Sequence, residues 1–156
     1  MDPADQGRTA GKIPRSFLPL LERSRTWFVM WLVWFTVLCI LSSMTHPGPH
    51  IDVAGIDKVE HTIYFAAGGT FLLLALALRG RSAAAALTGT SWRKLALVVL
   101  IAGAAVGWLD EWHQSFTPGR NGLDFYDWIA DITGSLAALP LARLFLRRLA
   151  SWVPDG

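Results

Sequence analysis

Titratable side chains are concentrated in residues 107–134, which read GWLDEWHQSFTPGRNGLDFYDWIADITG. A second polar group, DKVEH, lies upstream at residues 57–61. Carboxylates and imidazoles at this density can serve as general acids and bases, and an arginine can grip a phosphate through two parallel hydrogen bonds. Such chemistry requires that the two stretches meet in space, so the elements that carry them come next.

The sequence on both sides of these stretches is apolar. Of the 156 residues, 53% are hydrophobic, and the mean hydropathy is +0.38, well above the composition of an ordinary soluble domain. Four apolar segments stand out, at residues 26–43, 59–78, 95–109 and 128–146. A helix of about 20 apolar residues crosses a bilayer with every backbone group satisfied. We therefore predict an all-α, four-helix transmembrane bundle.

The segments between the predicted spans are rich in glycine, proline and serine, as loops are. The membrane domain is predicted over residues 25–150, with the third helix continuing through Gln114 and a short extra helix at residues 83–87. Residues 1–24 are expected to form a flexible tail. Cys39 is the single cysteine, so an intramolecular disulfide is excluded.

Lysine and arginine gather in segments that this topology places on one side of the membrane. They are Arg8, Lys12, Arg15, Arg23, Arg25, Arg79, Arg81, Arg93, Lys94, Arg143, Arg147 and Arg148, against Lys58 and Arg120 on the other side. Positive charge marks the cytoplasmic side, so both termini are expected in the cytoplasm and the polar stretches outside. This distribution argues against nucleic-acid binding, although the pI is near 9.0.

Helical spacing predicts that the polar residues share faces. The pairs three or four positions apart are Asp57 and His61, Lys58 and His61, Glu111 and Gln114, and Asp127 and Asp131. Ionisable groups in membrane segments usually face the bundle interior and mark function. Ordinary solvated charges and helix caps are the alternative, with Asp57 as an N-cap and with Asp124 and Asp127 favouring the start of the fourth helix through its dipole.

The acids outnumber the fixed bases in this region. Asp57, Asp110, Glu111, Asp124, Asp127 and Asp131 face only Lys58 and Arg120. Crowded carboxylates cannot all stay ionised, so we expect either Glu111 or Asp131 to carry a proton near neutral pH. A bound cation is the alternative, since His61, Glu111 and one aspartate are acceptable ligands. No tight metal motif is present, however, and we expect neither a metal nor another cofactor.

These residues resemble the VanZ-like family of small bacterial membrane proteins. The resemblance runs from about Ile56 to Ala138 and rests on DKVEHTIYF at 57–65, E-x-x-Q at 111–114, FTPGR at 116–120, an aspartate at 124 or 127, and Gly134. It implies a four-helix membrane domain. The namesake of the family is associated with resistance to a glycopeptide antibiotic, teicoplanin.

The leading functional interpretation is a site for an anionic lipid or lipid-linked envelope precursor on the outer face of the bacterial cytoplasmic membrane. Lys58 and Arg120 would hold a phosphate, and His61 and Glu111 are the candidate acid and base. The residues expected to bind the substrate are Asp57, Lys58, Gln114, Arg120, Asp124, Asp127 and Asp131. Among them, Gln114 would orient a substrate oxygen, and Asp124 and Asp127 would fix Arg120 or its loop.

Two other functions stay open at this point. One is a proton-coupled carrier using His61, Glu111 and Asp131, and the other is an accessory protein that binds without turnover. The residues leave catalysis itself undecided. The G-x-x-x-G pattern at residues 103–107 is interpreted as helix packing within the bundle, with homodimer formation as the alternative.

Overall fold

The computed structural model describes residues 15–45 and 55–152, and all regular structure in these ranges is helical. The elements are the 3₁₀ helix η2 (Arg15–Phe17), α1 (Leu18–Leu21), α2 (Ser24–Ser42), α3 (Ile56–Ala77), α4 (Ala83–Gly89), α5 (Trp92–Gln114) and α6 (Phe125–Trp152). Four of them, α2, α3, α5 and α6, are long and apolar enough to cross a membrane. The all-α class and the four predicted spans are confirmed, and they are those of a multi-pass membrane protein.

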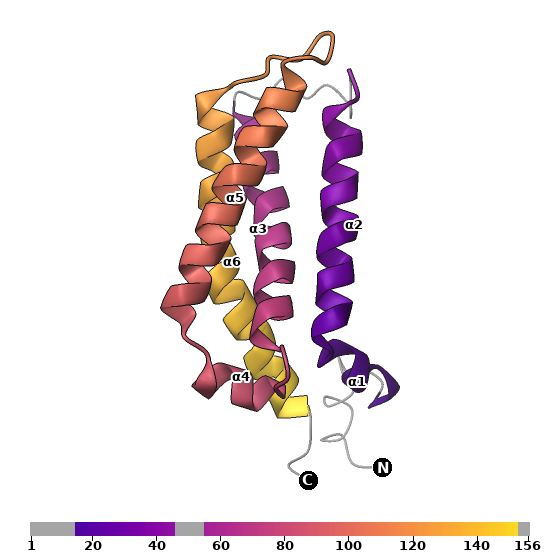
Figure 1. Ribbon diagram of the computed structural model, residues 1–156, viewed down its shortest axis with the longest axis vertical. Helices are drawn as coiled ribbons and strands as arrows, with labels where there is room; N and C mark the ends of the chain where they lie inside the picture. The colour runs from indigo at the N-terminus through magenta and orange to yellow at the C-terminus, as the bar shows by residue number, and fades with distance from the viewer. Residues whose placement is uncertain (1–14, 46–54, 153–156) are drawn as a thin grey trace, which may run out of the picture.

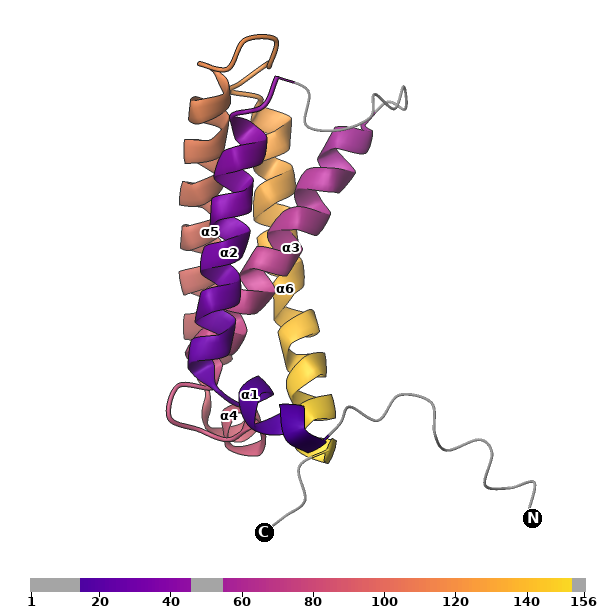
Figure 2. The same ribbon diagram turned by 90° about the vertical axis from the view of Figure 1, so that its right-hand side faces the viewer.

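The four long helices run side by side along the long axis (Figures 1 and 2). The pair α3 and α6 makes the most extensive contact, while α5 packs on α6 and α2 packs on α3. The short helices α1 and α4 lie at one end, beside the end of α6. The loop at 115–124 and the starts of α3 and α6 lie at the opposite end, which is where the polar stretches of the sequence meet.

Small residues allow the long helices to approach closely. A Cβ added to Gly134 on α6 would collide with the backbone carbonyl of Thr62 on α3 and lie 3.0 Å from the nitrogen of Ala66. On α5, a Cβ at Gly107 would lie 2.5 Å from an oxygen of Asp131. The G-x-x-x-G stripe therefore packs inside the bundle, as the sequence predicted.

An exchange of hydrogen bonds holds α2 on α3. The indole of Trp34 donates to the carbonyl of Tyr64 at 2.9 Å, and the Tyr64 hydroxyl donates to the carbonyl of Trp34 at 2.9 Å. Trp34 also lies against Gly68, where any side chain would displace it. This packing accounts for a tryptophan in the middle of an apolar helix. The outer faces, by contrast, expose apolar side chains such as Val33, Leu97 and Ile101.

The structure differs from the expected flexible tail, residues 1–24, in the part that begins at residue 15. Residues 1–14 lie outside the described ranges, but Arg15–Phe17 and Leu18–Leu21 are helical and Leu18 is buried. Glu22 accepts a hydrogen bond from the nitrogen of Ala83 at 3.0 Å, which satisfies a free N–H at the start of α4. This segment is ordered because it covers the end of the bundle. The short helix predicted at 83–87 is present as α4.

We predict that Gly134→Ala lowers the stability of the bundle by about 1–3 kcal/mol, the usual effect of overpacking against groups that cannot move. The added methyl group meets backbone rather than a flexible side chain. Thermal unfolding in detergent would measure the loss. Gly89→Ala is the control, because its nearest neighbour is the end of the Arg81 side chain at 3.8 Å. Equal stability of the two variants would contradict the close approach of α3 and α6.

Candidate functional site

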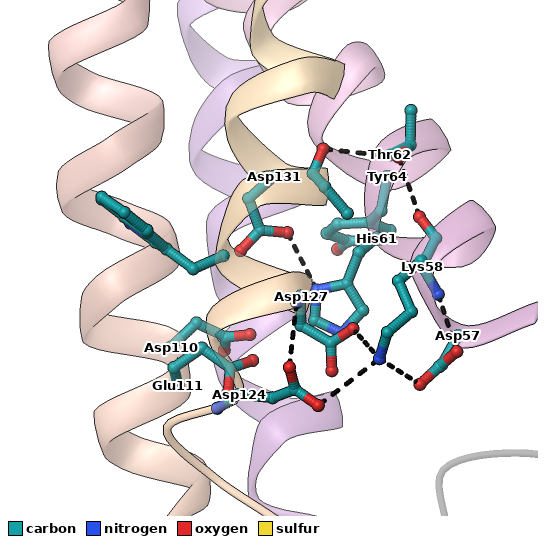
Figure 3. A network of polar contacts seen from close by, with 12 residues as sticks. Asp57, Lys58, His61, Thr62, Tyr64, Asp110, Glu111, Asp124, Asp127 and Asp131 are labelled. Atoms are coloured by element: carbon teal, nitrogen blue, oxygen red, sulfur yellow. Dashed lines mark hydrogen bonds and ion pairs between the residues drawn. The ribbon is translucent and has the colours of Figure 1, made fainter. Parts of the chain in front are cut away.

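The polar residues at the loop end form two clusters. The α3–α6 cluster consists of Asp57, Lys58, His61, Glu111, Asp124, Asp127 and Asp131 (Figure 3). The α2–α5 cluster consists of Ser42, Asp110, Gln114 and Arg120. The structure thus brings together residues more than 60 positions apart, but it divides the predicted site into two parts.

Lys58 is the cation of the α3–α6 cluster, and three carboxylates surround it. Its Nζ donates to Asp57 at 2.7 Å, to Asp127 at 2.8 Å and to Asp124 at 3.4 Å. The ammonium group has three hydrogens, so these contacts occupy its donor capacity. Lys58 joins the first turn of α3 to the start of α6, and its charge is already balanced within the protein.

His61 forms the deeper contact between the same two helices. Its Nδ1 lies 2.8 Å from Oδ1 of Asp131, whose side chain has no exposed surface. When Asp131 is ionised, its carboxylate only accepts hydrogen bonds, and Nδ1 then carries the hydrogen and donates it. The other nitrogen, Nε2, makes no hydrogen bond to any residue that the structure describes, and it is left with a lone pair when the imidazole is neutral.

Glu111 comes from α5 and is completely buried. Its Oε2 accepts the backbone N–H of Asp124 at 2.7 Å, which ties the end of the loop to α5. Among the described residues, its Oε1 has no hydrogen-bond partner, and neither has Oδ2 of Asp131. A buried polar atom without a partner costs about 1–3 kcal/mol. Two such oxygens at one end of the bundle therefore need an explanation.

Asp124 caps α6 at its N-terminus. Its Oδ1 accepts the N–H of Tyr126 at 2.8 Å and that of Asp127 at 3.4 Å. Donation from Tyr126 lowers the pKa of the Asp124 carboxyl below its usual value. The capping alternative is thus correct for Asp124. It is wrong for Asp57, because Gly55 is the capping residue of α3 and Asp57 lies in the first turn.

The loop at 115–124 folds back over the end of α5. The N–H of Leu123 donates to the carbonyl of Glu111 at 3.1 Å, and Leu123 has a φ of +62°, a conformation that side chains other than glycine rarely adopt. Gly122 lies so close to the backbone of Ser115 and Glu111 that a Cβ would not fit. This tight turn of the loop places Asp124 beside Glu111 and the start of α6 beside the end of α5.

The α2–α5 cluster positions Arg120. The guanidinium donates to Oε1 of Gln114 through Nε at 3.1 Å and Nη2 at 2.6 Å. Gln114 in turn donates to Oδ2 of Asp110 at 2.8 Å, and the Ser42 hydroxyl contacts Oδ1 of the same carboxylate. Within the described residues Arg120 makes no ion pair, so its charge is not balanced by direct contact.

One predicted contact is wrong in this geometry, because Asp124 and Asp127 bind Lys58 rather than Arg120. Asp124 does hold the end of the loop, through the bond from its N–H to Glu111. Gln114 is buried between Asp110 and Arg120 and holds the guanidinium, and its role in orienting a substrate oxygen stays a prediction. The error has one cause: the sequence shows which residues share a helix face but not which neighbouring helix that face meets.

Two residues of the site have no predicted role. Asp110 is one of the six acids of the polar stretches, and Ser42 lies in the first apolar segment. Asp110 and Gln114 are four positions apart, so their contact on one helix face was available from spacing. Ser42 reaches Asp110 from the end of α2, and no pattern in the sequence indicates that contact.

One group of side chains has the chemistry of a metal ligand set. His61, Glu111 and Asp127 each offer one ligand atom, and these atoms lie within 4.8 Å of one another. The three residues come from α3, α5 and α6. Their types, one imidazole and two carboxylates, suit a divalent transition metal.

The chain matches no protein-family model, no curated protein and no solved structure. What the site does is therefore argued from its geometry.

We predict that Asp124→Ala destabilises the protein by about 0.5–2 kcal/mol, the usual range for loss of a helix cap. Asp124→Asn is the matched variant, because an amide oxygen still accepts the N–H groups of Tyr126 and Asp127. Thermal unfolding in detergent should rank wild type above Asp124→Asn and Asp124→Ala lowest. An Asp124→Ala protein as stable as Asp124→Asn would contradict the capping role.

The difference in stability between wild type and Asp124→Asn also depends on pH. A carboxyl whose pKa is lowered on folding stabilises the folded state above its unfolded pKa, about 3.9 for aspartate. That contribution is lost as the pH falls through the lower value in the folded protein. The advantage of wild type over Asp124→Asn should therefore be full near neutral pH and shrink below about pH 4.

Proposed function

We propose that this chain is a VanZ-like integral membrane protein of the bacterial cytoplasmic membrane that binds an anionic lipid head group or lipid-linked envelope precursor at its extracytoplasmic end. The observation that carries the proposal is Arg120, a guanidinium held in place by Gln114 without a carboxylate partner among the described residues. A role in glycopeptide resistance follows only from the family resemblance and is part of the same proposal.

Arg120 has the features of an anion contact. It is half-buried on the loop, and two of its donor groups are fixed on a neutral amide oxygen. The remaining N–H groups can make charge-assisted, bidentate bonds to a phosphate. Lys58 does not share this role, because three carboxylates already surround it and would repel an anion.

The surroundings of the loop suit a lipid ligand. Trp108, Trp112 and Phe116 are exposed at this end of the bundle, and aromatic side chains are enriched where a membrane meets water. An acyl or prenyl chain would lie along the apolar outer face of α5 while its head group reaches Arg120.

The distribution of basic residues supports an extracytoplasmic location. Arg79, Arg81, Arg93 and Lys94 flank α4, and Arg147 and Arg148 lie near the end of α6, at the end opposite the loop. By the positive-inside rule that end faces the cytoplasm. Lys58 and Arg120 then face the periplasmic or external side.

The location of the polar groups favours a binding site at the membrane surface over a carrier pathway. An apolar pocket does lie inside the bundle, lined by residues including Trp31, Phe65 and Val99, but no charged side chain lines it. His61, Glu111 and Asp131 all lie towards one end. If the bound ligand reacts, His61, hydrogen-bonded to Asp131, is the group placed to accept a proton through Nε2.

We predict that the loop end is extracytoplasmic. With Cys39→Ser as background, which removes the single native cysteine, Asn121→Cys and Ala84→Cys place a thiol on the exposed loop and on exposed α4. A membrane-impermeant maleimide added to intact cells should label Asn121→Cys, and it should label Ala84→Cys only after permeabilisation. The reverse pattern would contradict the proposed orientation.

We predict that Arg120→Ala weakens binding of polyprenyl phosphate about tenfold or more, as expected for loss of a charge-assisted hydrogen bond. Arg120→Lys should recover part of the affinity, because it restores the charge but not the bidentate geometry. Native mass spectrometry in mild detergent measures both. Arg147→Ala, an exposed arginine at the opposite end, is the matched control.

The lipids to be tested are also compared in pairs that differ in one chemical feature. Polyprenol without phosphate tests whether the anion is required, and phosphatidylglycerol against phosphatidylethanolamine tests whether any anionic phospholipid suffices. Equal binding of polyprenyl phosphate and polyprenol, or equal affinity in Arg120→Ala and Arg147→Ala, would refute the anion-binding site.

A further inference from the structure

The α3–α6 cluster has features that an anion contact at Arg120 does not explain. Its five carboxylates face one lysine, so four negative charges are in excess when all five are ionised and His61 is neutral. Much of this charge is buried, since Glu111 and Asp131 have no exposed surface and Asp127 is 9% exposed. Buried carboxylates are stable when they are paired or coordinate a metal.

Glu111 is the clearest sign of a missing partner. It projects from α5 to the junction with α3 and α6, beside His61, Asp124 and Asp127 (Figure 3). One oxygen is satisfied by the N–H of Asp124, and the other is buried with no partner in residues 15–45 and 55–152. An unpartnered carboxylate oxygen in this position is a free ligand atom for a cation.

His61 and Asp127 supply the other two ligand atoms. Asp127 uses Oδ1 for Lys58, and its Oδ2 makes no hydrogen bond in the described part of the chain. One ligand atom from each of the three residues lies within 4.8 Å of the others. In a tetrahedral site with bonds of about 2.1 Å, two ligand atoms lie about 3.4 Å apart, so side-chain rotations that draw the three groups together would let them bind one ion.

The contact with Asp131 orients the imidazole of His61 as a metal ligand requires. Metal-binding histidines almost always donate their other ring N–H to a carboxylate or carbonyl, which fixes the tautomer and the ring orientation. The hydrogen bond from Nδ1 of His61 to Asp131 is that contact. It leaves Nε2 as the nitrogen that can bind an ion.

We infer that His61, Glu111 and Asp127 bind one divalent transition-metal ion, with Zn²⁺ the best match to this ligand set. One imidazole nitrogen and two carboxylate oxygens are ligands that Zn²⁺ accepts, and three protein ligands leave a fourth position open. The sequence offered a cation on His61, Glu111 and one aspartate only as the alternative to a proton, because each ligand lies on a different helix and no spacing reveals the set. This inference goes beyond the proposed function and does not depend on it.

The test uses the full chain with a tag that contains no histidine, purified in detergent and freed of metal by a chelator. ZnCl₂ is then titrated in without added lipid, and bound metal is counted by elemental mass spectrometry after desalting. Wild type should bind one Zn²⁺ per chain. Glu111→Gln and His61→Gln should each weaken binding at least about tenfold. Asp131→Asn, which keeps an acceptor for the Nδ1–H of His61 but removes the negative charge behind it, should weaken binding about 10–100-fold.

Glu60→Gln is the matched control. Glu60 is an exposed acid on α3, one residue from His61, and makes no hydrogen bond within the described ranges. Its loss should leave the affinity within about twofold of wild type, because an exposed charge is screened by salt. Absence of one bound Zn²⁺ in wild type would overturn the inference, and so would retention of Zn²⁺ by both Glu111→Gln and His61→Gln.

A second measurement avoids dependence on the folding of the variants. Wild-type protein loaded with Co²⁺ should show the visible absorption of a four-coordinate ion, and Zn²⁺ should displace it. Only the weak spectrum of hydrated Co²⁺ would contradict the site. Because no lipid is added and Arg120 is not a ligand, failure here leaves the proposed anion site to its own test.

Discussion

Asp131 is a carboxylate with no exposed surface, placed where α3, α5 and α6 meet. Burying such a group without partners costs several kcal/mol, so the helices around it are constrained. His61 on α3 must reach it, which fixes the rotation of α3 against α6. Gly107 on α5 must lack a side chain, because a Cβ there would lie 2.5 Å from the carboxylate. One buried acid thus sets the packing of three helices.

The remaining polar contacts follow from the position of Asp131. Asp127 lies one helical turn before it and meets Lys58, one turn before His61. Asp124 ends the loop, caps α6 and contacts both Lys58 and Glu111. Each step towards the surface adds a contact between segments distant in sequence. The polar end is therefore held by contacts between distant segments, while contacts towards the α1 and α4 end are mainly apolar.

The helices were predictable because the signals are local. The length of the apolar segments predicted the four spans. The G-x-x-x-G stripe predicted a packing face, and the structure places that face against Asp131 and Ser135. Spacing also predicted that Lys58 and His61 share a face, and both meet α6. The predicted contact between Arg120 and the aspartates of the loop region was wrong. Arg120 and Asp127 are both near the loop in sequence, yet the fold of residues 115–124 turns Arg120 towards Gln114 on α5 and Asp127 towards Lys58 on α3.

Ser42 and the free oxygen of Glu111 show why sequence alone could not complete the site. Ser42 becomes part of it only because Thr117 in the loop hydrogen-bonds to its carbonyl at 2.9 Å, a contact across 75 residues. The missing partner of Glu111 is a property of three-dimensional packing and has no sequence signal. The count of charges did indicate repulsion between these carboxylates, since it predicted either a proton or a cation among them.

The central claim is that the buried carboxylates of the α3–α6 cluster form a binding site for a cation. Anomalous X-ray diffraction at the zinc absorption edge, from crystals grown in a lipid phase and soaked in ZnCl₂, tests it most directly. The account predicts one strong peak about 2.1 Å from His61 Nε2, Glu111 Oε1 and Asp127. No peak between these three side chains, with Glu111 Oε1 still unpartnered, would contradict it.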